Sequence, residues 1–216
     1  MKKKFKLNFL LTVMFVFVYF FVFSQVSTVK IGTQNWTTEN LNVNKFRNGD
    51  FIKQAKTIRK WKKFGRRKKP AWCYYENKSK NGSTYGKLYN WYAVNDPRGL
   101  APKGFHVPSD SEWIQLTEYL GGEDIAGQKM KATSGWKAHI NNFSNGNNIS
   151  GFTGLPGGYR YLEGTFLYLG SFGYWWSSTQ DNDANAWYRD QSYNKSNASR
   201  DVNSKRDGLS VRCIKD

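Results

Sequence analysis

A helical pattern of hydrophobic residues lies near the middle of the chain. Trp113, Leu116 and Leu120 recur at spacings of three and four, which places them on one face of a helix. Ser109 is the expected N-cap because Glu112 follows it by three residues, the spacing of a capping box. The glycine pair after Leu120 is expected to end the helix. The polar residues around Ser109 are therefore interpreted as a helix start and not as a catalytic cluster.

Short stretches in which polar and hydrophobic residues alternate predict β-strands, most of them in the second half of the chain. Residues 159–162 and 166–168 predict a hairpin, with Glu163-Gly164 as its turn. Residues 126–131 predict a second, shorter helix. Because helices lie in the middle and strands at the end, the pattern predicts an α+β fold with antiparallel sheet. The other predicted strands are residues 26–31, 39–43, 174–178, 186–190 and 209–214.

The first 24 residues have the pattern of a secretory signal. A cap of lysines precedes an apolar run from Phe9 to Phe23, and Ser24 provides a small residue at the exit. The run of about 15 residues is shorter than the roughly 20 that a membrane span needs. We therefore expect residues 1–24 to be a signal peptide and 25–216 to be one exported domain, secreted or on the cell surface. The alternative is an uncleaved anchor.

Most of the positive charge lies in one stretch. The formal charge is +17, and residues 53–69 contain ten lysines and arginines but no acid. Removing these ten and the four lysines of the predicted signal leaves +3. We expect a basic loop insertion at about 53–70.

Three interpretations of the basic stretch stay open. The first is a solvated, mobile loop. The second is an electrostatic site for an anionic polymer, such as acidic polysaccharide, lipopolysaccharide phosphate or extracellular nucleic acid. The third is a short helix on a membrane surface, because Ile58, Trp61 and Phe64 are spaced by three. The candidate anion-binding residues are Arg59, Lys60, Lys62, Lys63, Arg66, Arg67, Lys68 and Lys69.

Residues typical of catalysis are few. Neither His106 nor His139 lies near a nucleophile motif such as G-x-S-x-G, and His106 is expected to be structural. The chain also lacks zinc-ligand spacing and a phosphate-binding glycine loop. We expect no catalytic residue, no resident metal and no cofactor, hence a protein that is not an enzyme.

Calcium is the one metal with a partial motif. Asp181, Asp183 and Asn185 alternate in the sequence DNDAN. A calcium loop of this type also needs Gly at its sixth position and Glu at its twelfth, where the chain has Ala186 and Ser192. A polar turn is the favoured interpretation, and calcium stays an unsupported alternative.

Aromatic residues on adjacent predicted strands give the only positive indication of a ligand. In alternating strands, one member of the Trp175/Trp176 pair and one of the Trp187/Tyr188 pair should point outward. An exposed ring can stack on a sugar while a neighbour such as Arg189 bonds its hydroxyl groups. The alternative is that these rings fill the core. The candidate ligand-binding residues are Trp175, Trp176, Trp187, Tyr188 and Arg189.

Seven short motifs occur in a characteristic order: IGTQNWTTENLN, AWCYYEN, YGKLYNWYAV, GFHVPSDSEW, GFTGLPGGYR, YWWSST and GLSVRC. From about Val29 to Asp216 the chain thus resembles the Fibrobacter succinogenes major paralogous domain family. The resemblance implies an exported bacterial protein with a C-type lectin-like fold, in which short helices pack on a twisted antiparallel sheet, as in formylglycine-generating-enzyme-like domains. It implies no reaction and no catalytic residues.

The two cysteines differ from what the resemblance implies. A cysteine is expected where Ala101 stands, and another shortly after Cys73, where the chain has only Lys78 to Ser83. Cys73 and Cys213 could pair with each other, closing a loop worth roughly 4–5 kcal/mol, or stay buried and reduced. Cys213 shares one face of the predicted strand 209–214 with Leu209 and Val211, which favours burial.

Together these patterns predict an exported, non-catalytic binding or adhesion module for polysaccharide or an anionic polymer. One alternative is a structural envelope protein with protein partners. Another is a degenerate enzyme of the formylglycine-generating type, against which the single C-terminal cysteine argues.

Overall fold

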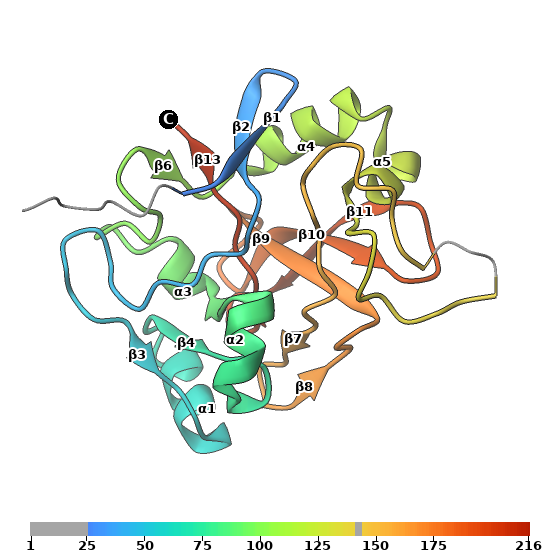
Figure 1. The fold of residues 1–216 in the computed structure, drawn as a ribbon. Helices are drawn as coiled ribbons and strands as arrows, with labels where there is room; N and C mark the ends of the chain where they lie inside the picture. Colours follow the sequence, from blue (N-terminus) through green and yellow to red (C-terminus); the bar gives the residue numbers. More distant parts are fainter. Residues whose placement is uncertain (1–25, 141–143) are drawn as a thin grey trace, which may run out of the picture.

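A computed structural model describes residues 26–140 and 144–216 and confirms the α+β class (Figure 1). Its paired strands are antiparallel, apart from β3 (Lys53–Gln54), which pairs in parallel with β4 (Ala71–Cys73). The predicted signal peptide lies outside the described residues. Within those residues, no helix has the length and hydrophobicity to cross a bilayer.

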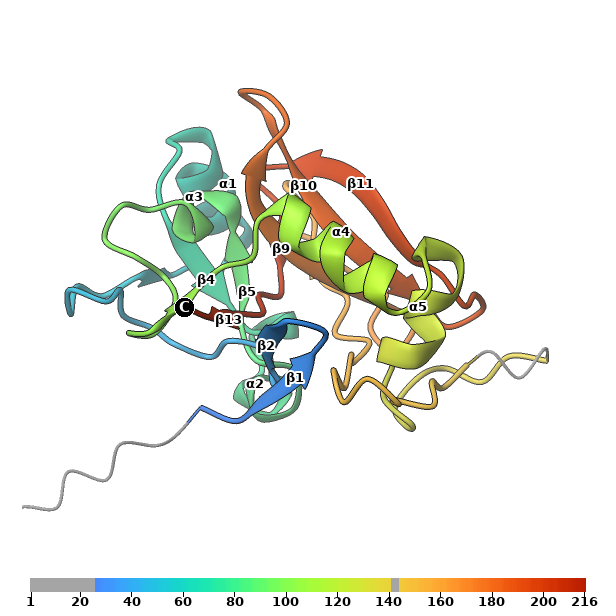
Figure 2. The same ribbon diagram turned by 90° about the horizontal axis from the view of Figure 1, so that it is seen from above.

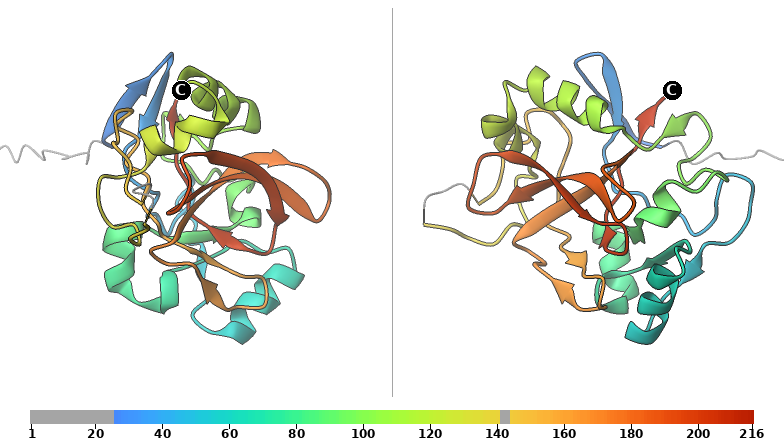
Figure 3. Two further views of the ribbon diagram at one scale, coloured as in Figure 1. Left: turned by 90° about the vertical axis from the view of Figure 1, so that its right-hand side faces the viewer. Right: turned by 180° about the vertical axis from the view of Figure 1, so that it is seen from behind.

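Three long strands form a sheet that two helices cover on one face. The sheet contains β9 (Phe172–Gln180), β10 (Asn185–Ser192) and β11 (Ala198–Ser204), with β10 in the middle. Helices α4 (Asp110–Tyr119) and α5 (Glu123–Met130) lie along it (Figure 2). The twist of the three strands is clearest when the molecule is seen from the side and from behind (Figure 3).

The predicted capping box starts α4. The Ser109 hydroxyl accepts a hydrogen bond from the Glu112 backbone N–H at 3.3 Å, and the Ser109 N–H donates to the Glu112 carboxylate at 2.7 Å. Trp113 is fully buried, and its ring meets Trp36 at 4.6 Å and Phe152 at 5.8 Å. The apolar face of α4 is therefore a central part of the core.

A second sheet has the strand order β3-β4-β5-β12-β7-β8. It includes the predicted hairpin, with β7 (Tyr159–Arg160) and β8 (Phe166–Leu167) joined by a turn in which Gly164 has φ +101°, a conformation that favours glycine. Its other strands are β5 (Leu88–Asn90) and β12 (Gly208–Leu209). The short helices between its strands are α1 (Ile58–Arg66), the 3₁₀ helix η1 (Tyr75–Asn77), α2 (Ser79–Tyr85) and α3 (Trp91–Val94).

A third sheet joins the two ends of the described chain. Strands β1 (Thr28–Ile31) and β2 (Gln34–Thr37) pair with each other, and β2 also pairs with β13 (Ile214–Lys215). Strand β6 (Phe105–His106) completes the sheet on the other side of β13. The C-terminus thus lies close to β1, β2 and β6 (Figure 1).

Two predicted strands differ from the structure. Residues 39–43 are irregular, and residues 209–214 are divided between β12 and β13. Leu209, Val211 and Cys213 are buried as predicted, but so are Ser210 and Arg212 between them. The segment crosses the interior of the molecule, and therefore both of its faces are covered.

Candidate functional site

The predicted basic loop contains a helix, α1. The Thr57 hydroxyl caps it by accepting from the Lys60 N–H at 3.2 Å, and Lys69 N–H donates to the Phe64 carbonyl at 2.9 Å beyond its end. Lys63 and Arg66 lie in the last turn, where positive charge suits the helix dipole. The helical spacing of hydrophobic residues is thus confirmed, and residues 58–66 form a helix and not a loop.

One tryptophan holds α1 against the body of the protein. Trp61 is 1% exposed, and its ring lies 2.8 Å from where a Cβ on Gly208 of β12 would stand. The Arg160 guanidinium lies over the same ring, 4.8 Å from its centre. On the same side of the helix, Gly65 packs on Arg206. The absence of a side chain at Gly208 allows Trp61 to reach the second sheet, and α1 is fixed in place.

The cations of α1 and the residues after it face solvent. Of the ten cations in 53–69, Lys62 alone forms an ion pair with a described residue, Glu163. An open hollow of about 680 Å³ lies over the helix. We call the residues that line it the α1 surface: Ile58, Arg59, Lys62, Lys63, Arg66 and Arg67.

The spacing on the α1 surface suits an extended anion. Arg59, Lys63 and Arg67 follow one another at intervals of four, as do Ile58, Lys62 and Arg66, so each series forms a row along the helix. Like charges at this spacing repel one another. A bound polyanion would remove this repulsion, and the arginine guanidinium can bond phosphate, sulfate or carboxylate with two parallel N–H groups.

The structure contradicts the outward orientation expected of the Trp175/Trp176 pair. Both side chains are fully buried. The Trp175 indole donates to Asn40 at 2.8 Å, and the Trp176 indole donates to the Tyr89 carbonyl at 2.8 Å. Because β9 is covered on both faces, alternation sends each ring into a different part of the core. Neither ring is available to a ligand.

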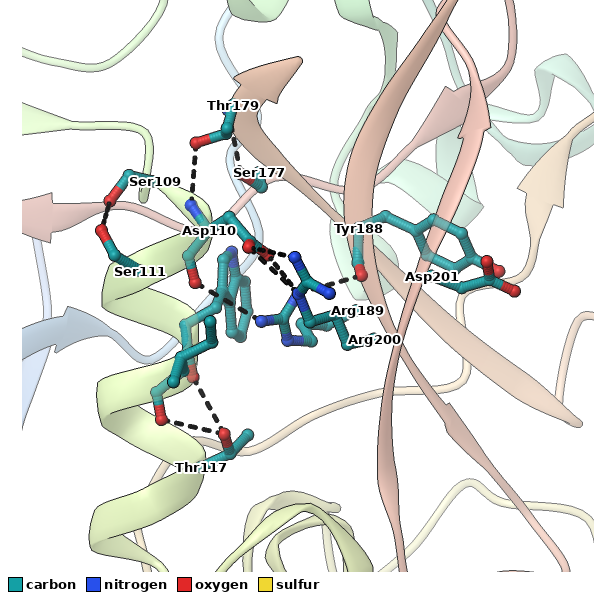
Figure 4. Close-up of polar contacts among 12 residues, drawn as sticks. Ser109, Asp110, Ser111, Thr117, Ser177, Thr179, Tyr188, Arg189, Arg200 and Asp201 are labelled. Atoms are coloured by element: carbon teal, nitrogen blue, oxygen red, sulfur yellow. Dashed lines mark hydrogen bonds and ion pairs between the residues drawn. The ribbon is translucent and has the colours of Figure 1, made fainter. Parts of the chain in front are cut away.

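Arg189 is part of an internal ion-pair network and is not free to bind a ligand. Its side chain is buried and bonds the Asp110 carboxylate at 2.8 Å, and Arg200 bonds the same carboxylate at 2.8 Å (Figure 4). Burial opposes the charge on Asp110, but its bonds to Arg200 and Arg189 outweigh this and lower its pKa. The network fixes the start of α4 to β10 and β11. These ion pairs could not be predicted from the sequence, since the partners of Asp110 are distant in the chain.

The two remaining aromatic candidates are also largely covered. Arg200 lies over the Trp187 ring, 3.4 Å from its centre, and Trp187 is half-buried. Tyr188 is 9% exposed and points to the opposite face of the sheet. The five aromatic and arginine candidates therefore do not form one ligand-binding surface.

His106 is held between two carboxylates. Its Nδ1 lies 2.8 Å from Asp216 and its Nε2 lies 2.8 Å from Glu112. Partial burial opposes the charged ring, but the bonds from Asp216 and Glu112 outweigh it and raise the pKa of His106. The nearby Ser109 hydroxyl donates to Glu112. Both ring nitrogens are therefore engaged in linking β6, α4 and the C-terminal residue, beside an open hollow of about 510 Å³.

Comparison with known families settles the relationship that the motifs indicated. A family model for the Fibrobacter succinogenes major domain matches residues 29–215. The chain belongs to this family. No curated protein and no solved structure matches it.

This Fibrobacter succinogenes major domain contains two free thiols. Cys73 and Cys213 are both buried and unbonded, which rules out the disulfide alternative for this structure. They lie in separate hydrophobic clusters. Burial raises the pKa of Cys73 to about 11 and that of Cys213 to about 12. Such thiols are poor nucleophiles and poor metal ligands at neutral pH.

The DNDAN segment of the domain forms the turn between β9 and β10. The Asn182 side chain accepts from the N–H groups of Ala184 and Asn185, and the Lys205 ammonium bonds the carbonyls of Asn182 and Asp183. A lysine thus supplies the positive charge at this turn. In the part of the chain that the structure describes, no three His, Cys, Asp or Glu side chains gather as a metal site.

Proposed function

We propose that this protein is an exported, non-catalytic binding module that attaches to an anionic polymer through the α1 surface. The observation that carries the proposal is the combination of a fixed helix and unpaired charge. Trp61 anchors α1, while nine of the ten cations in 53–69 have no acidic partner among the described residues. A purely structural helix would not need this density of like charge.

The partner class follows from the geometry of the charges. A row of cations at helical spacing contacts several anionic groups at once, and each contact releases a counterion from a densely charged polymer. Acidic polysaccharide at the bacterial surface is the partner that fits an exported protein. Secretion or surface location, and a C-type lectin-like architecture, are part of this proposal. The packing of α4 and α5 on one face of a twisted antiparallel sheet supports that architecture.

Heparin, as a sulfated polysaccharide, provides the direct test on residues 25–216. The variant Arg59→Gln/Lys63→Gln/Arg66→Gln/Arg67→Gln should bind at least about tenfold more weakly. The slope of log affinity against log salt concentration should also become shallower, by roughly 0.7–0.9 for each lost contact.

A matched control removes the same charge elsewhere. Four exposed lysines lie outside the α1 surface: Lys30, Lys80, Lys103 and Lys215. Replacing all four by glutamine lowers the net charge by the same amount, and should reduce heparin affinity much less than the α1 variant does. If the control loses as much affinity as the α1 variant, the net charge and not the α1 surface governs binding. Equal binding to neutral dextran would also overturn the proposal.

A further inference from the structure

The face of the β9–β11 sheet opposite α4 and α5 combines aromatic rings with carboxylates. Tyr174 stands directly opposite Asp190, and Tyr188 directly opposite Asp201. Residues paired in this way point to the same face. Figure 4 shows Tyr188 and Asp201 together, on the side of the strands away from Arg189 and Arg200.

A continuous row of rings leads from this face to solvent. Tyr188 meets Tyr174 at 5.9 Å, and Tyr174 meets Tyr159 of β7 at 4.9 Å and Phe172 at 5.6 Å. Tyr168, just beyond β8, stacks on Tyr159 at 6.0 Å and is 50% exposed. No hydroxyl group in this row donates or accepts a hydrogen bond within the described residues. Tyr168 thus exposes its ring at the surface, while Tyr174 and Tyr188 are 8% and 9% exposed and join the row to the hydrophobic core.

Two carboxylates beside the rings lack a compensating cation. Asp207 is 1% exposed and forms no ion pair with a described residue; the Leu162 backbone N–H favours its charged form but lies outside hydrogen-bond geometry. Asp207 directly precedes Gly208, which pairs with Arg160 of β7, so Asp207 lies beside the strand that carries Tyr159. Asp190 lies on the same sheet face as Tyr188, and burial together with Asp201 raises its pKa to about 7.

The basic groups nearby are too few to balance these acids. Lys195 is exposed and favours the charged form of Asp190 without forming an ion pair with it. Arg206 favours the charged form of Asp207, but its guanidinium is bonded to Glu163 at 3.3 Å. Desolvated carboxylates without a partner are costly, and a cation that reached the partly exposed Asp190 would lower that cost.

We propose that the acidic aromatic cluster, which consists of Tyr159, Tyr168, Phe172, Tyr174, Tyr188 and Asp190, binds an organic ammonium cation of the lysine side-chain type. Asp190 pairs with the ammonium group, and the field of Asp201 and Asp207 adds to the attraction. Tyr168 and Tyr159 lie along the carbon chain, since ring faces attract cations and cover apolar carbon. This site is independent of the α1 surface, which has the opposite charge.

The test uses residues 25–216, with N-acetyl-lysine methylamide as the probe. Binding is followed by nuclear magnetic resonance shifts at a pH of about 8, above the raised pKa of Asp190. Saturable binding is expected, with shifts on the ring row. The neutral N-acetyl-norleucine methylamide should bind at least about tenfold more weakly. Asp190→Asn, which keeps the shape of the side chain, should weaken lysine binding by a similar factor, and Tyr168→Ala should weaken it about threefold or more.

Asp183→Asn is the matched control, since Asp183 is an exposed carboxylate in the β9–β10 turn; it should leave affinity unchanged. Near-ultraviolet circular dichroism checks that each variant is folded. Equal binding of the norleucine compound, equal loss in the Asp183 control, or no binding up to about 50 mM would overturn the proposal. If methyl glucoside bound the same rings with Asp190→Asn having no effect, the cluster would be a sugar site and not a cation site.

Discussion

Among the described residues, most buried charged side chains have hydrogen-bond partners, whereas Asp207 has none in hydrogen-bond geometry. Arg212 donates to the carbonyls of Thr37 at 2.7 Å and Phe152 at 2.8 Å, and Arg160 donates to the carbonyl of Ala55 at 2.6 Å. Asp207 is as deeply buried, yet neither oxygen has a partner in hydrogen-bond geometry; the Leu162 backbone N–H and Arg206 favour its charge, but burial outweighs them. The free-energy cost of burying this negative charge can therefore be measured as a change in the free energy of unfolding.

Replacing Asp207 with asparagine should stabilise the protein above neutral pH. Burial raises the pKa of Asp207 from 3.8 to about 7. Between these values the folded state keeps a proton that the unfolded state has lost, so the free energy of unfolding falls as the pH rises from about 4 to about 7. At a pH of about 8, Asp207→Asn should raise the free energy of unfolding by about 2–4 kcal/mol. Near a pH of about 4 the difference should nearly vanish.

Urea unfolding at the two pH values measures this effect. Asp190 titrates in the same direction, since burial raises its pKa to about 7 as well. For that reason the comparison is made between the variant and the parent at each pH. A variant that is less stable than the parent at the higher pH would show that the Asp207 carboxylate has a compensating partner.

At the scale of single elements, local signals could be predicted from the sequence and distant contacts could not. The capping box of α4 depends on two residues three positions apart, and the β7–β8 turn depends on one glycine. Both were predicted. The spacing of Ile58, Trp61 and Phe64 indicated a helix, but the anchoring of Trp61 depends on Gly208, which is distant in the chain. A charge count alone therefore suggested a loop.

Burial on both faces of a strand explains the other errors. Trp175 and Trp176 lie on opposite faces of β9, and alternation predicted that one of them would be exposed. One face meets the α4 cluster around Trp113, and the other meets the cluster around Tyr89. Nothing in a single strand indicates whether its second face is covered. The ion pairs of Asp110 could not be predicted for a similar reason, because its partners lie on other strands, β10 and β11.

The variant Trp61→Ala tests whether the anchoring of α1 by Trp61 is needed for an ordered binding surface. Trp61→Ala should lower the free energy of unfolding by about 3–5 kcal/mol, because a fully buried tryptophan is removed. Heparin binding should weaken as well, although all ten cations remain, since a loosened helix no longer holds them in rows. Phe64→Ala is the comparison, as Phe64 is only partly buried, and its cost should be smaller.

Thermal unfolding and hydrogen exchange of residues 58–66 measure the consequence of removing the anchor. Faster exchange confined to α1 in Trp61→Ala would locate the loss. A change in stability within about 0.5 kcal/mol would mean that Trp61 does not anchor the helix.

At the scale of the whole molecule, the β7–β8 hairpin lies between the two proposed sites. Glu163 in its turn pairs with Lys62 of α1, while Tyr159 and Tyr168 of the same hairpin belong to the acidic aromatic cluster. One short hairpin thus contacts a basic helix and contributes rings to an acidic face. Distortion of the hairpin would therefore affect both sites.

The thiols report whether the separate hydrophobic clusters unfold as one unit. Cys73 lies in the cluster that includes Trp61, and Cys213 lies in the cluster that includes Trp176. Both are buried, and their pKa values are raised to about 11 and about 12. Neither should react with a thiol reagent at a pH of about 8 while the protein is folded, because the thiolate is scarce and covered. In rising urea both should become reactive over the same concentration range, as expected of a single cooperative domain. Mass spectrometry after partial labelling separates the two sites. If Cys73 reacts at a lower urea concentration than Cys213, the region around α1 unfolds independently, and the helix would not be a fixed part of the domain.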